Sequence, residues 1–361
     1  MQKIAMIHPN LFERGGAERK LILMSKYLVD NGYDVKIIVK DYNKETTFKE
    51  FIDEKLKIIE YKGNKIEWFK KIYNHLKENN YDLVVAHNYP ANIPVAIFKM
   101  FNKNKKICWV CNEVAVLLHR RDSFAWQMYY KIEKFLNKNF DVIIANSTFT
   151  AGSIQEYYKK EPIVIRSGVE IKEDIDLTKI DKKVIEIAKK DYIFSLSRIE
   201  EHKNIKMLEK IAKNLDINIL VAGKGSFIDY IKNLEKKYKN IIYLGAVNEN
   251  EKFYLYKNAK IFAFLPKAEP LGVTTMEALS QNTPVVAYNN GGPKEIILDK
   301  INGFLSNNDE EYIKNLQYIL TENFTLKDKD GKEYIKKKFS NERMVKDFFD
   351  VFVNIMGEKN D

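Results

Sequence analysis

The residues best suited to chemistry in this sequence are two glutamates with seven residues between them, Glu269 and Glu277. Glu269 lies in a predicted loop after a short apolar run, and Glu277 lies in the helix predicted to follow. The amides of residues 272–274 would form the N-terminus of that helix, where free N–H groups attract anions and hydroxyls. A carboxylate accepts two hydrogen bonds and so suits the vicinal hydroxyls of a sugar or a ribose. The segment therefore predicts a site for a ligand that combines hydroxyls with negative charge.

Two cations follow another predicted strand. Arg198 and Lys203 come directly after the run 192–197 and before a helix. At the carboxyl edge of a sheet, a planar guanidinium and a compact ammonium suit a diphosphate. Taken alone, the pair also fits ordinary surface charge.

A glycine pair, Gly15 and Gly16, stands between the first predicted strand and the first predicted helix. Glycines there let backbone amides approach an anion, although a tight strand-to-helix turn explains them equally well. The sequence has neither the G-x-G-x-x-G dinucleotide pattern nor a Walker-type phosphate loop.

Two other patterns carry no metal or redox prediction. Cys108 and Cys111 form C-x-x-C, but they lie on a predicted strand and no second pair completes a zinc site. The two D-x-D sequences, at 174–176 and 328–330, lie in charged segments away from the glycine turns and are typical of solvated loops.

The elements that must position these residues are short apolar runs alternating with amphipathic segments. Predicted strands are 3–8, 35–39, 82–86, 107–111, 141–145 and 162–166, followed by 192–197, 217–222, 241–244, 260–264 and 284–288. Predicted helices are 17–31, 66–79, 124–139 and 149–159, followed by 205–215, 227–239, 251–258 and 272–281. Apolar strands separated by helices indicate parallel sheets covered on both faces. Two such series predict two doubly wound α/β domains.

The boundary between these domains is expected within residues 168–190, where charged residues cluster. We expect an N-terminal domain over 1–170, a second domain over 171–340, and a C-terminal helix over 341–361 that packs back on the first domain. In open α/β sheets, ligands bind at the carboxyl ends of the strands. The predicted site is the cleft between the two sheets.

Composition limits the classes of protein to consider. The chain has 361 residues, 45% of them hydrophobic, and two cysteines. No apolar run is long enough to span a bilayer, and the first residues lack a signal-peptide pattern, so a cytoplasmic protein is expected. The net charge of +10 is uneven, because residues 1–170 carry 28 basic and 20 acidic residues and the remainder is nearly balanced. This asymmetry indicates an acidic partner: nucleic acid, anionic membrane or a phosphorylated substrate.

The segment 99–138 concentrates basic and aromatic residues, with nine Lys or Arg against three Asp or Glu. Such a mixture suits an anionic membrane interface. The alternative is that the aromatic side chains are core and the lysines only solvate the surface.

An ordered set of these motifs resembles glycosyltransferase family 4, whose members have two Rossmann-like domains in the GT-B arrangement. The set consists of Gly15-Gly16-Ala17-Glu18, Asn146-Ser147, Arg198 with Lys203, Gly223-Lys224-Gly225, and Glu269 with Glu277. The run Gly15–Arg19 and residues 109–113 are most similar to mannosyltransferases that build lipid-linked oligosaccharides.

The resemblance implies transfer of a hexosyl group, with mannose favoured and configuration retained, from a GDP- or UDP-sugar without a metal or cofactor. Arg198 and Lys203 then match the diphosphate-binding pair, and Glu277 matches the carboxylate that holds the ribose. Glu269 matches the residue beside the donor sugar. The remaining donor-binding matches are the amides of Leu271, Gly272 and Val273, the turn at Gly223, and the loop of Gly15 and Gly16.

One departure from the family pattern concerns the residue facing the donor sugar. Asn112 stands where related enzymes often carry His, and an amide can hydrogen-bond but cannot take a proton. His87 and His119 are the candidates to substitute for it in the cleft, although each taken alone fits a structural or surface role. Residues 166–170 also depart from the family's usual sequence at the domain junction.

The expected partners are a nucleotide diphosphate sugar, a polyprenyl-linked or glycan acceptor, and an anionic membrane surface, which would make the protein peripheral on the inner face of the cell membrane. Nucleic acid is not expected, because no helix-turn-helix or RNA-recognition signature accompanies the charge. Two alternatives remain: a nucleotide-sugar epimerase or phosphorylase on the same fold, and a basic nucleic-acid-binding protein.

Overall fold

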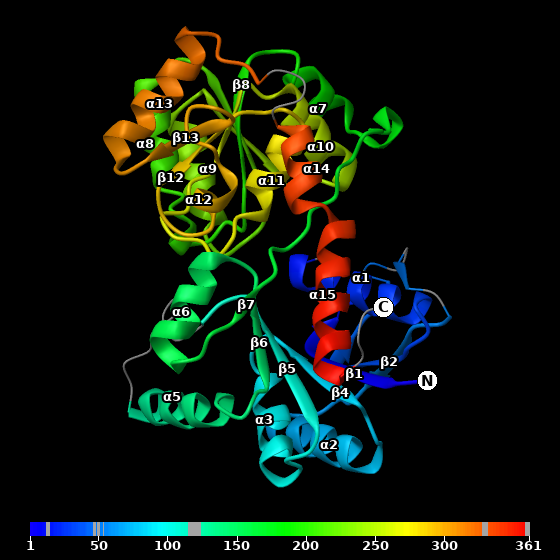
Figure 1. Ribbon diagram of the computed structural model, residues 1–361. Helices are drawn as coiled ribbons and strands as arrows, with labels where there is room; N and C mark the ends of the chain where they lie inside the picture. Colours follow the sequence, from blue (N-terminus) through cyan, green and yellow to red (C-terminus); the bar gives the residue numbers. More distant parts are fainter. Residues whose placement is uncertain are drawn as a thin grey trace. The chain divides into compact units, whose positions relative to one another are not determined.

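The computed structural model describes residues 1–11, 15–45, 48, 51–52, 54–114, 124–326 and 331–357. The chain divides into two compact units (Figure 1). Unit 1 comprises residues 1–168 together with 341–361, and unit 2 comprises residues 169–340. Each unit contains one parallel sheet covered by helices on both faces. The α/β class with two doubly wound domains is therefore confirmed.

Unit 1 contains a seven-stranded sheet in the order β3-β2-β1-β4-β5-β6-β7. Its strands are β1 (Lys3–Leu11), β2 (Asp34–Tyr42), β3 (Lys57–Glu60), β4 (Leu83–His87), β5 (Lys106–Cys111), β6 (Val142–Ala145) and β7 (Ile163–Val164). Its described helices are α1 (Gly16–Asp30), α2 (Lys65–Glu78), α3 (Asn92–Phe101), α5 (Phe124–Asn137), α6 (Thr148–Tyr158) and α15 (Asn341–Met356).

The first strand shows why this sheet is a central layer. Ala5 and Ile7 pack into a core with α2, α3 and α6, whereas Ile4 and Met6 pack into a second core with α1 and α15. All four side chains are fully buried. A strand with four consecutive buried apolar residues must be covered on both faces, which requires crossover helices on both sides.

The C-terminal helix α15 belongs to unit 1 although it follows unit 2 in the chain. Its apolar residues recur at helical spacing, and Met344, Phe348 and Phe352 are buried in the core that α1 also covers. Tyr27 of α1 meets the ring of Phe349 edge to face at 5.5 Å. This packing fixes the end of the chain on the first sheet.

Unit 2 contains a six-stranded sheet in the order β10-β9-β8-β11-β12-β13. Its strands are β8 (Tyr192–Leu196), β9 (Asn218–Ala222), β10 (Ile241–Gly245), β11 (Ile261–Ala263), β12 (Val285–Tyr288) and β13 (Gly303–Ser306). Its α-helices are α7 (Lys182–Ile187), α8 (Met207–Asn214), α9 (Ile228–Lys237), α10 (Glu249–Asn258), α11 (Val273–Ser280), α12 (Pro293–Ile296), α13 (Asp309–Thr321) and α14 (Lys332–Phe339).

The order of strands in unit 2 creates a switch point between β8 and β11. From β8 the chain runs outward through β9 and β10, and it then returns to the other side of β8 at β11. At such a point the loops leaving two neighbouring strands diverge and open a crevice at the carboxyl edge of the sheet. The loops after β8 and β11 are those that carry the cations and Glu269.

Some elements differ from the sequence prediction. The prediction did not include the short strands β3 and β13 or the helices α3, α7, α12, α13 and α14, and β7 spans two residues where five were expected. No helix among the described residues is both long and apolar enough to cross a membrane. Cys108 and Cys111 are buried on β5, and burial raises the pKa of both thiols above their usual range.

Candidate functional site

Arg198 and Lys203, both in the loop after β8, differ in their exposure to solvent. Arg198 is exposed, and neither a hydrogen bond nor an ion pair ties its guanidinium to another described residue. Lys203 ends a short 3₁₀ turn (Glu201–Lys203) and is buried to 8% exposure. Asn204 follows it in the left-handed conformation and donates its amide to the carbonyl of Leu265 at 2.9 Å. This bond ties the loop after β8 to the chain leaving β11.

Lys203 and Glu269 are ion-paired at the switch point. The Lys203 ammonium lies 2.5 Å from Glu269 Oε2, and the two side chains are 10% and 24% exposed. Breaking a largely buried pair by removing one partner costs about 3–5 kcal/mol, because it leaves a charge without compensation. Two residues that the sequence assigned to different parts of a ligand therefore form one unit.

The glycine turns at this edge are required by close backbone approach. Gly223 ends β9 with φ of +133°, and a Cβ there would lie 1.9 Å from the carbonyl oxygen of Ser197. A Cβ on Gly291 would lie 2.3 Å from the Glu269 carbonyl oxygen, and the amide of Gly292 donates to that oxygen at 2.8 Å. The loops after β8, β11 and β12 are thus held against neighbouring turns.

The loop that carries Glu269 leads into α11. Gly272 caps that helix in the left-handed region, with φ of +87°, and Val273 is its first residue. Leu271 is buried at 3% exposure and anchors the turn. Glycine has no side chain with which to cap the helix, and the Thr275 amide donates to the Gly272 carbonyl at 3.0 Å, so the amides of Val273 and Thr274 are left for other acceptors.

Glu277 lies on α11 with its two carboxylate oxygens already engaged. Lys252 of α10 donates to Oε1 at 2.8 Å, and the Tyr256 hydroxyl donates to Oε2 at 3.2 Å. Burial by itself would lower the pKa of Lys252, but the charge of Glu277 reverses this and raises it. Burial, and then Glu277, raises the pKa of Tyr256 well above its usual range. Lys252 therefore stays charged and Tyr256 stays a donor.

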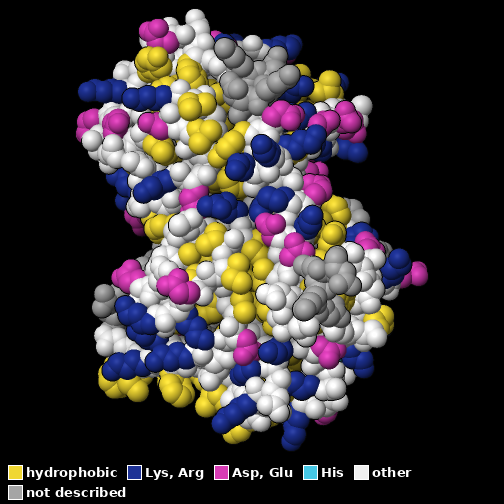
Figure 2. All heavy atoms as spheres, in the orientation of Figure 1, with side chains coloured by type: hydrophobic (Ala, Val, Ile, Leu, Met, Phe, Trp, Pro, Cys, Tyr) yellow, Lys and Arg dark blue, Asp and Glu magenta, His cyan; other side chains and the backbone are white. Residues whose placement is uncertain are grey.

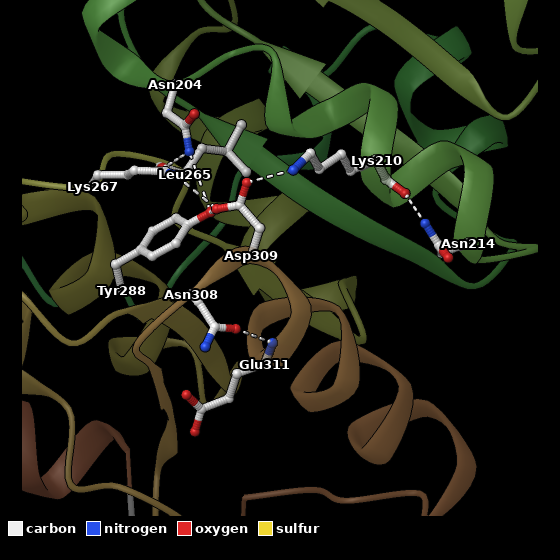
Figure 3. A network of polar contacts seen from close by, with 9 residues as sticks. All are labelled: Asn204, Lys210, Asn214, Leu265, Lys267, Tyr288, Asn308, Asp309 and Glu311. Carbon is white, nitrogen blue, oxygen red and sulfur yellow. Dashed lines mark hydrogen bonds and ion pairs between the residues drawn. The ribbon is translucent and has the colours of Figure 1, made fainter.

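A polar network lies beside this edge, around Asp309 at the start of α13 (Figure 3). Its carboxylate accepts from Lys210 at 2.7 Å and from Tyr288 at 2.8 Å, and Lys267 lies 2.8 Å away. Although burial opposes it, these three donors hold the pKa of Asp309 well below its ordinary range. A polar pocket of about 420 Å³ adjoins the network, between the loops that follow β12 and β13.

In unit 1, the corresponding switch point lies between β1 and β4. Gly15 caps α1 without a side-chain hydrogen bond, and Gly16 is the first residue of that helix. His87 ends β4, with its ring centroid 6.3 Å from that of His8 on β1. Both imidazoles are 2% exposed, and the Nε2 atom of each has no hydrogen-bond partner among the described residues. His119 lies outside the described residues.

Asn112 follows β5, and its side-chain amide oxygen, Oδ1, accepts a hydrogen bond from the buried ammonium of Lys20. Burial lowers the pKa of Lys20 to about 8. An ammonium can only donate, so this bond assigns the oxygen of Asn112 to Lys20 and leaves the amide nitrogen to donate elsewhere. Burial also lowers the pKa of His8 to about 4 and that of His87 well below its usual value, so both rings are neutral at pH 7.

The structure therefore gathers Lys203, Glu269 and the α11 cap at one sheet edge of unit 2, with Arg198 exposed beside them. Gly15, Gly16, His87 and Asn112 belong to unit 1. Within the described ranges, no three His, Cys, Asp or Glu side chains come together as a metal site.

Sequence reasoning missed four polar partners: Lys252, Tyr256, Lys20 and His8. The first two are four residues apart on α10 and so share one face, which was the available signal. The signal for His8 was a polar residue at the end of a fully buried strand. Lys20 gave no signal, because it stands among ordinary helix formers.

Two parallel α/β units, each with a switch point in its strand order, define the class as a two-domain, doubly wound α/β protein. Two family models match the chain: "Glycosyltransferase Family 4" over residues 14–173 and "Glycosyl transferases group 1" over residues 177–338. Human alpha-1,3/1,6-mannosyltransferase ALG2 is 24% identical, with 96% of this chain and 94% of that protein covered. The chain is a glycosyltransferase and belongs to family 4, with the GT-B fold.

Solved structures support the fold. A sucrose-phosphate synthase from Thermosynechococcus elongatus has a TM-score of 0.80 at 16% identity, covering 98% of this chain and 99% of that one. Anabaena Alr3699/HepE in complex with UDP and glucose has a TM-score of 0.79 at 18% identity, covering 98% and 100%. The family assignment implies a nucleotide-sugar donor and a glycan acceptor.

Proposed function

We propose that the protein is a retaining mannosyltransferase that takes its sugar from a nucleotide diphosphate sugar. The observation that carries the proposal is the switch point of unit 2, where Arg198, the Lys203–Glu269 pair and the uncapped start of α11 share one edge. The preference for mannose rests on relatives named alpha-1,3/1,6-mannosyltransferase, including those of human and mouse.

Each residue has a role that follows from its environment. Departure of a nucleoside diphosphate develops negative charge, which the exposed guanidinium of Arg198 and the ammonium of Lys203 stabilise. Glu269, held by Lys203, accepts hydrogen bonds from the hydroxyls of the donor sugar. Glu277 accepts from the ribose, and its orientation is fixed by Lys252 and Tyr256. No proton has to be taken by a protein side chain if the leaving diphosphate accepts it.

In unit 1, Asn112 is the proposed contact to a sugar hydroxyl. Its amide nitrogen is the group available for this, because Lys20 occupies the side-chain amide oxygen, Oδ1. Gly15 and Gly16 begin α1, whose N-terminal amides would meet an anionic group beside the Glu18 carboxylate of the first turn. His87 is neutral and buried, which suits a hydrogen-bonding role rather than a charged one.

The acceptor in this proposal is a polyprenyl-linked glycan, and the basic first unit meets an anionic membrane, where such an acceptor resides. The supporting observations are the relatives' activity and the excess of eight positive charges in residues 1–170. For a mannose donor we propose GDP as the nucleotide, with UDP as the alternative to be tested.

The test combines product analysis with calorimetry. Incubation with GDP-mannose or UDP-glucose and a polyprenyl-diphosphate-linked glycan should give one added hexose by mass spectrometry. An epimerised donor or a sugar phosphate in place of this product would contradict the proposal.

Arg198→Ala should weaken GDP binding about 10- to 100-fold, the worth of one charged hydrogen bond, while guanosine binding stays within about twofold. Lys232→Ala, which removes an exposed charge from α9, is the matched control. Equal losses for GDP and guanosine would show that Arg198 does not bind the diphosphate.

A further inference from the structure

Helix α5 of unit 1 has an unusual distribution of side chains. Phe124, Met128, Ile132 and Phe135 are 79%, 42%, 54% and 60% exposed. Their spacing places them along one side of the helix. A helix on the surface of a globular protein normally turns such a stripe toward the core. Here the apolar stripe faces outward.

The buried side of the same helix combines a polar cluster with Leu136, which packs into the core. Glu133 is 6% exposed, and its Oε1 accepts from Tyr158 at 2.7 Å, Asn137 at 2.6 Å and Asn92 at 3.3 Å. These bonds fasten α5 to α3 and α6 with a defined orientation. The outward stripe is therefore not the consequence of a loosely attached helix, because a buried hydrogen-bonded cluster fixes which side faces out.

The apolar surface continues onto α3, which packs against α5. Met100 and Phe101 at the end of α3 are 38% and 72% exposed. Lys99 of α3 is ion-paired at 2.8 Å with Asp141, which follows α5 directly ahead of β6. The C-terminal ends of the two helices thus lie together.

The charges around the stripe are positive. Lys131 on α5 and Lys138 directly after it are exposed, while the one acidic residue of α5, Glu133, is buried. Lys103 and Lys106 are exposed in the segment after α3, which has no acidic residue between 99 and 112. Figure 2 shows a row of hydrophobic side chains along the lower edge, where α5 lies, with Lys and Arg side chains next to it. We call this surface, Phe124, Met128, Lys131, Ile132, Phe135 and Lys138 with the end of α3, the α5 face.

We propose that the α5 face inserts into the headgroup region of an anionic bilayer. Apolar side chains at helical spacing enter the acyl boundary, and the flanking lysines reach anionic headgroups. A second copy of the chain is a poorer occupant, because it would oppose lysines to lysines. The inference rests on the proposed function only in that a lipid-linked acceptor would be met at this surface.

The experiment measures flotation with vesicles of phosphatidylcholine and phosphatidylglycerol, at low and high salt, against vesicles of phosphatidylcholine alone. Ile132→Gln should reduce partition roughly tenfold, since about half of a large aliphatic side chain loses its burial. The matched control is Ile301→Gln in unit 2, which changes an isoleucine of similar exposure, 59%. Lys131→Gln should reduce partition about fivefold at low salt and less at high salt.

A second readout is Phe124→Trp, which places a tryptophan on the stripe, because Trp126 lies on the opposite side of α5 and Trp68 and Trp109 are buried. Phosphatidylcholine brominated on its acyl chains, mixed with phosphatidylglycerol, should quench the fluorescence of this bound variant more strongly than that of the bound unsubstituted protein. Vesicle binding without this additional quenching would place another surface on the membrane and overturn the proposal.

Three other outcomes would also overturn it: no binding to anionic vesicles, equal partition for Ile132→Gln and Ile301→Gln, or a dimer that Ile132→Gln dissociates while vesicle binding is absent. Transfer to a soluble short-chain acceptor, measured in parallel, separates the two proposals. Transfer without vesicle binding rejects the α5 face and keeps the proposed glycosyl transfer. Additional quenching in Phe124→Trp without transfer supports the α5 face and rejects the proposed glycosyl transfer.

Discussion

The Lys252–Glu277 pair gives the sharpest test of how the candidate donor site is held. Lys252→Met keeps the aliphatic bulk and removes the ammonium, so the Glu277 carboxylate, whose side chain is 9% exposed, retains only the Tyr256 hydroxyl. A buried charge that loses its counter-charge costs about 3–5 kcal/mol. We expect the unfolding free energy of unit 2 to fall by about this amount, and replacing Glu277 by Gln in the same variant to recover most of it.

The three tryptophans make the assay specific. Trp68, Trp109 and Trp126 all lie in unit 1, so fluorescence during urea denaturation follows that unit, whereas far-ultraviolet circular dichroism follows both. Lys252→Met should shift the dichroism transition and leave the fluorescence transition in place.

The matched control is Lys260→Met. Its ion pair with Asp191 is long, at 3.5 Å, and the two side chains are 47% and 72% exposed, so its loss should cost no more than about 1 kcal/mol. If Lys252→Met costs no more than Lys260→Met, or if the double variant is the least stable of the series, Glu277 is not a buried charge that depends on Lys252.

Two further outcomes concern unit 1. Burial lowers the pKa of His8 from 6.5 to about 4. Between pH 4 and pH 6.5 the unfolded state therefore binds more protons than the folded state. The stability that His8 contributes is complete above pH 6.5 and falls by about 3 kcal/mol as the pH drops to 4. In fluorescence-monitored denaturation, the unfolding free energy should fall less steeply with decreasing pH in His8→Asn, whereas His202→Asn should behave like the unsubstituted protein. An unchanged pH dependence in His8→Asn would rule out a lowered pKa of His8. Asn112→Ala should lower turnover without altering its pH profile, because an amide does not titrate; disappearance of an ionisation in that variant would count against the proposed role.

Most of the fold could be predicted from local pattern. Residues 4–7 and 192–194 are apolar at consecutive positions, which is typical of a strand covered on both faces, and the helices between such strands favour parallel pairing. The strands β3 and β13 escaped prediction because each spans four residues, and β3 is only partly buried, so neither produces a strong apolar signal.

The position of Arg198, Lys203 and Glu269 at one sheet edge could also be predicted from the sequence, because each follows a strand and parallel strands bring their carboxyl ends to one edge. The aromatic segment 99–138 was ambiguous in the sequence, since core and surface aromatics have the same composition. Burial separates them: Trp109 is 2% exposed, while Phe124 is 79% exposed.

The sequence by itself determined the two α/β series, the glycine turns and the order of charged residues along the chain, because these depend on short-range periodicity and backbone sterics. Only the tertiary structure decided which charges meet. Lys203 pairs with Glu269 across 66 residues, and Lys20 reaches Asn112 across 92. Such contacts depend on strand order and on the packing of crossover helices, which local patterns do not encode. The same reason explains α5, whose outward side was selected by the buried cluster around Glu133 rather than by its own hydrophobic periodicity.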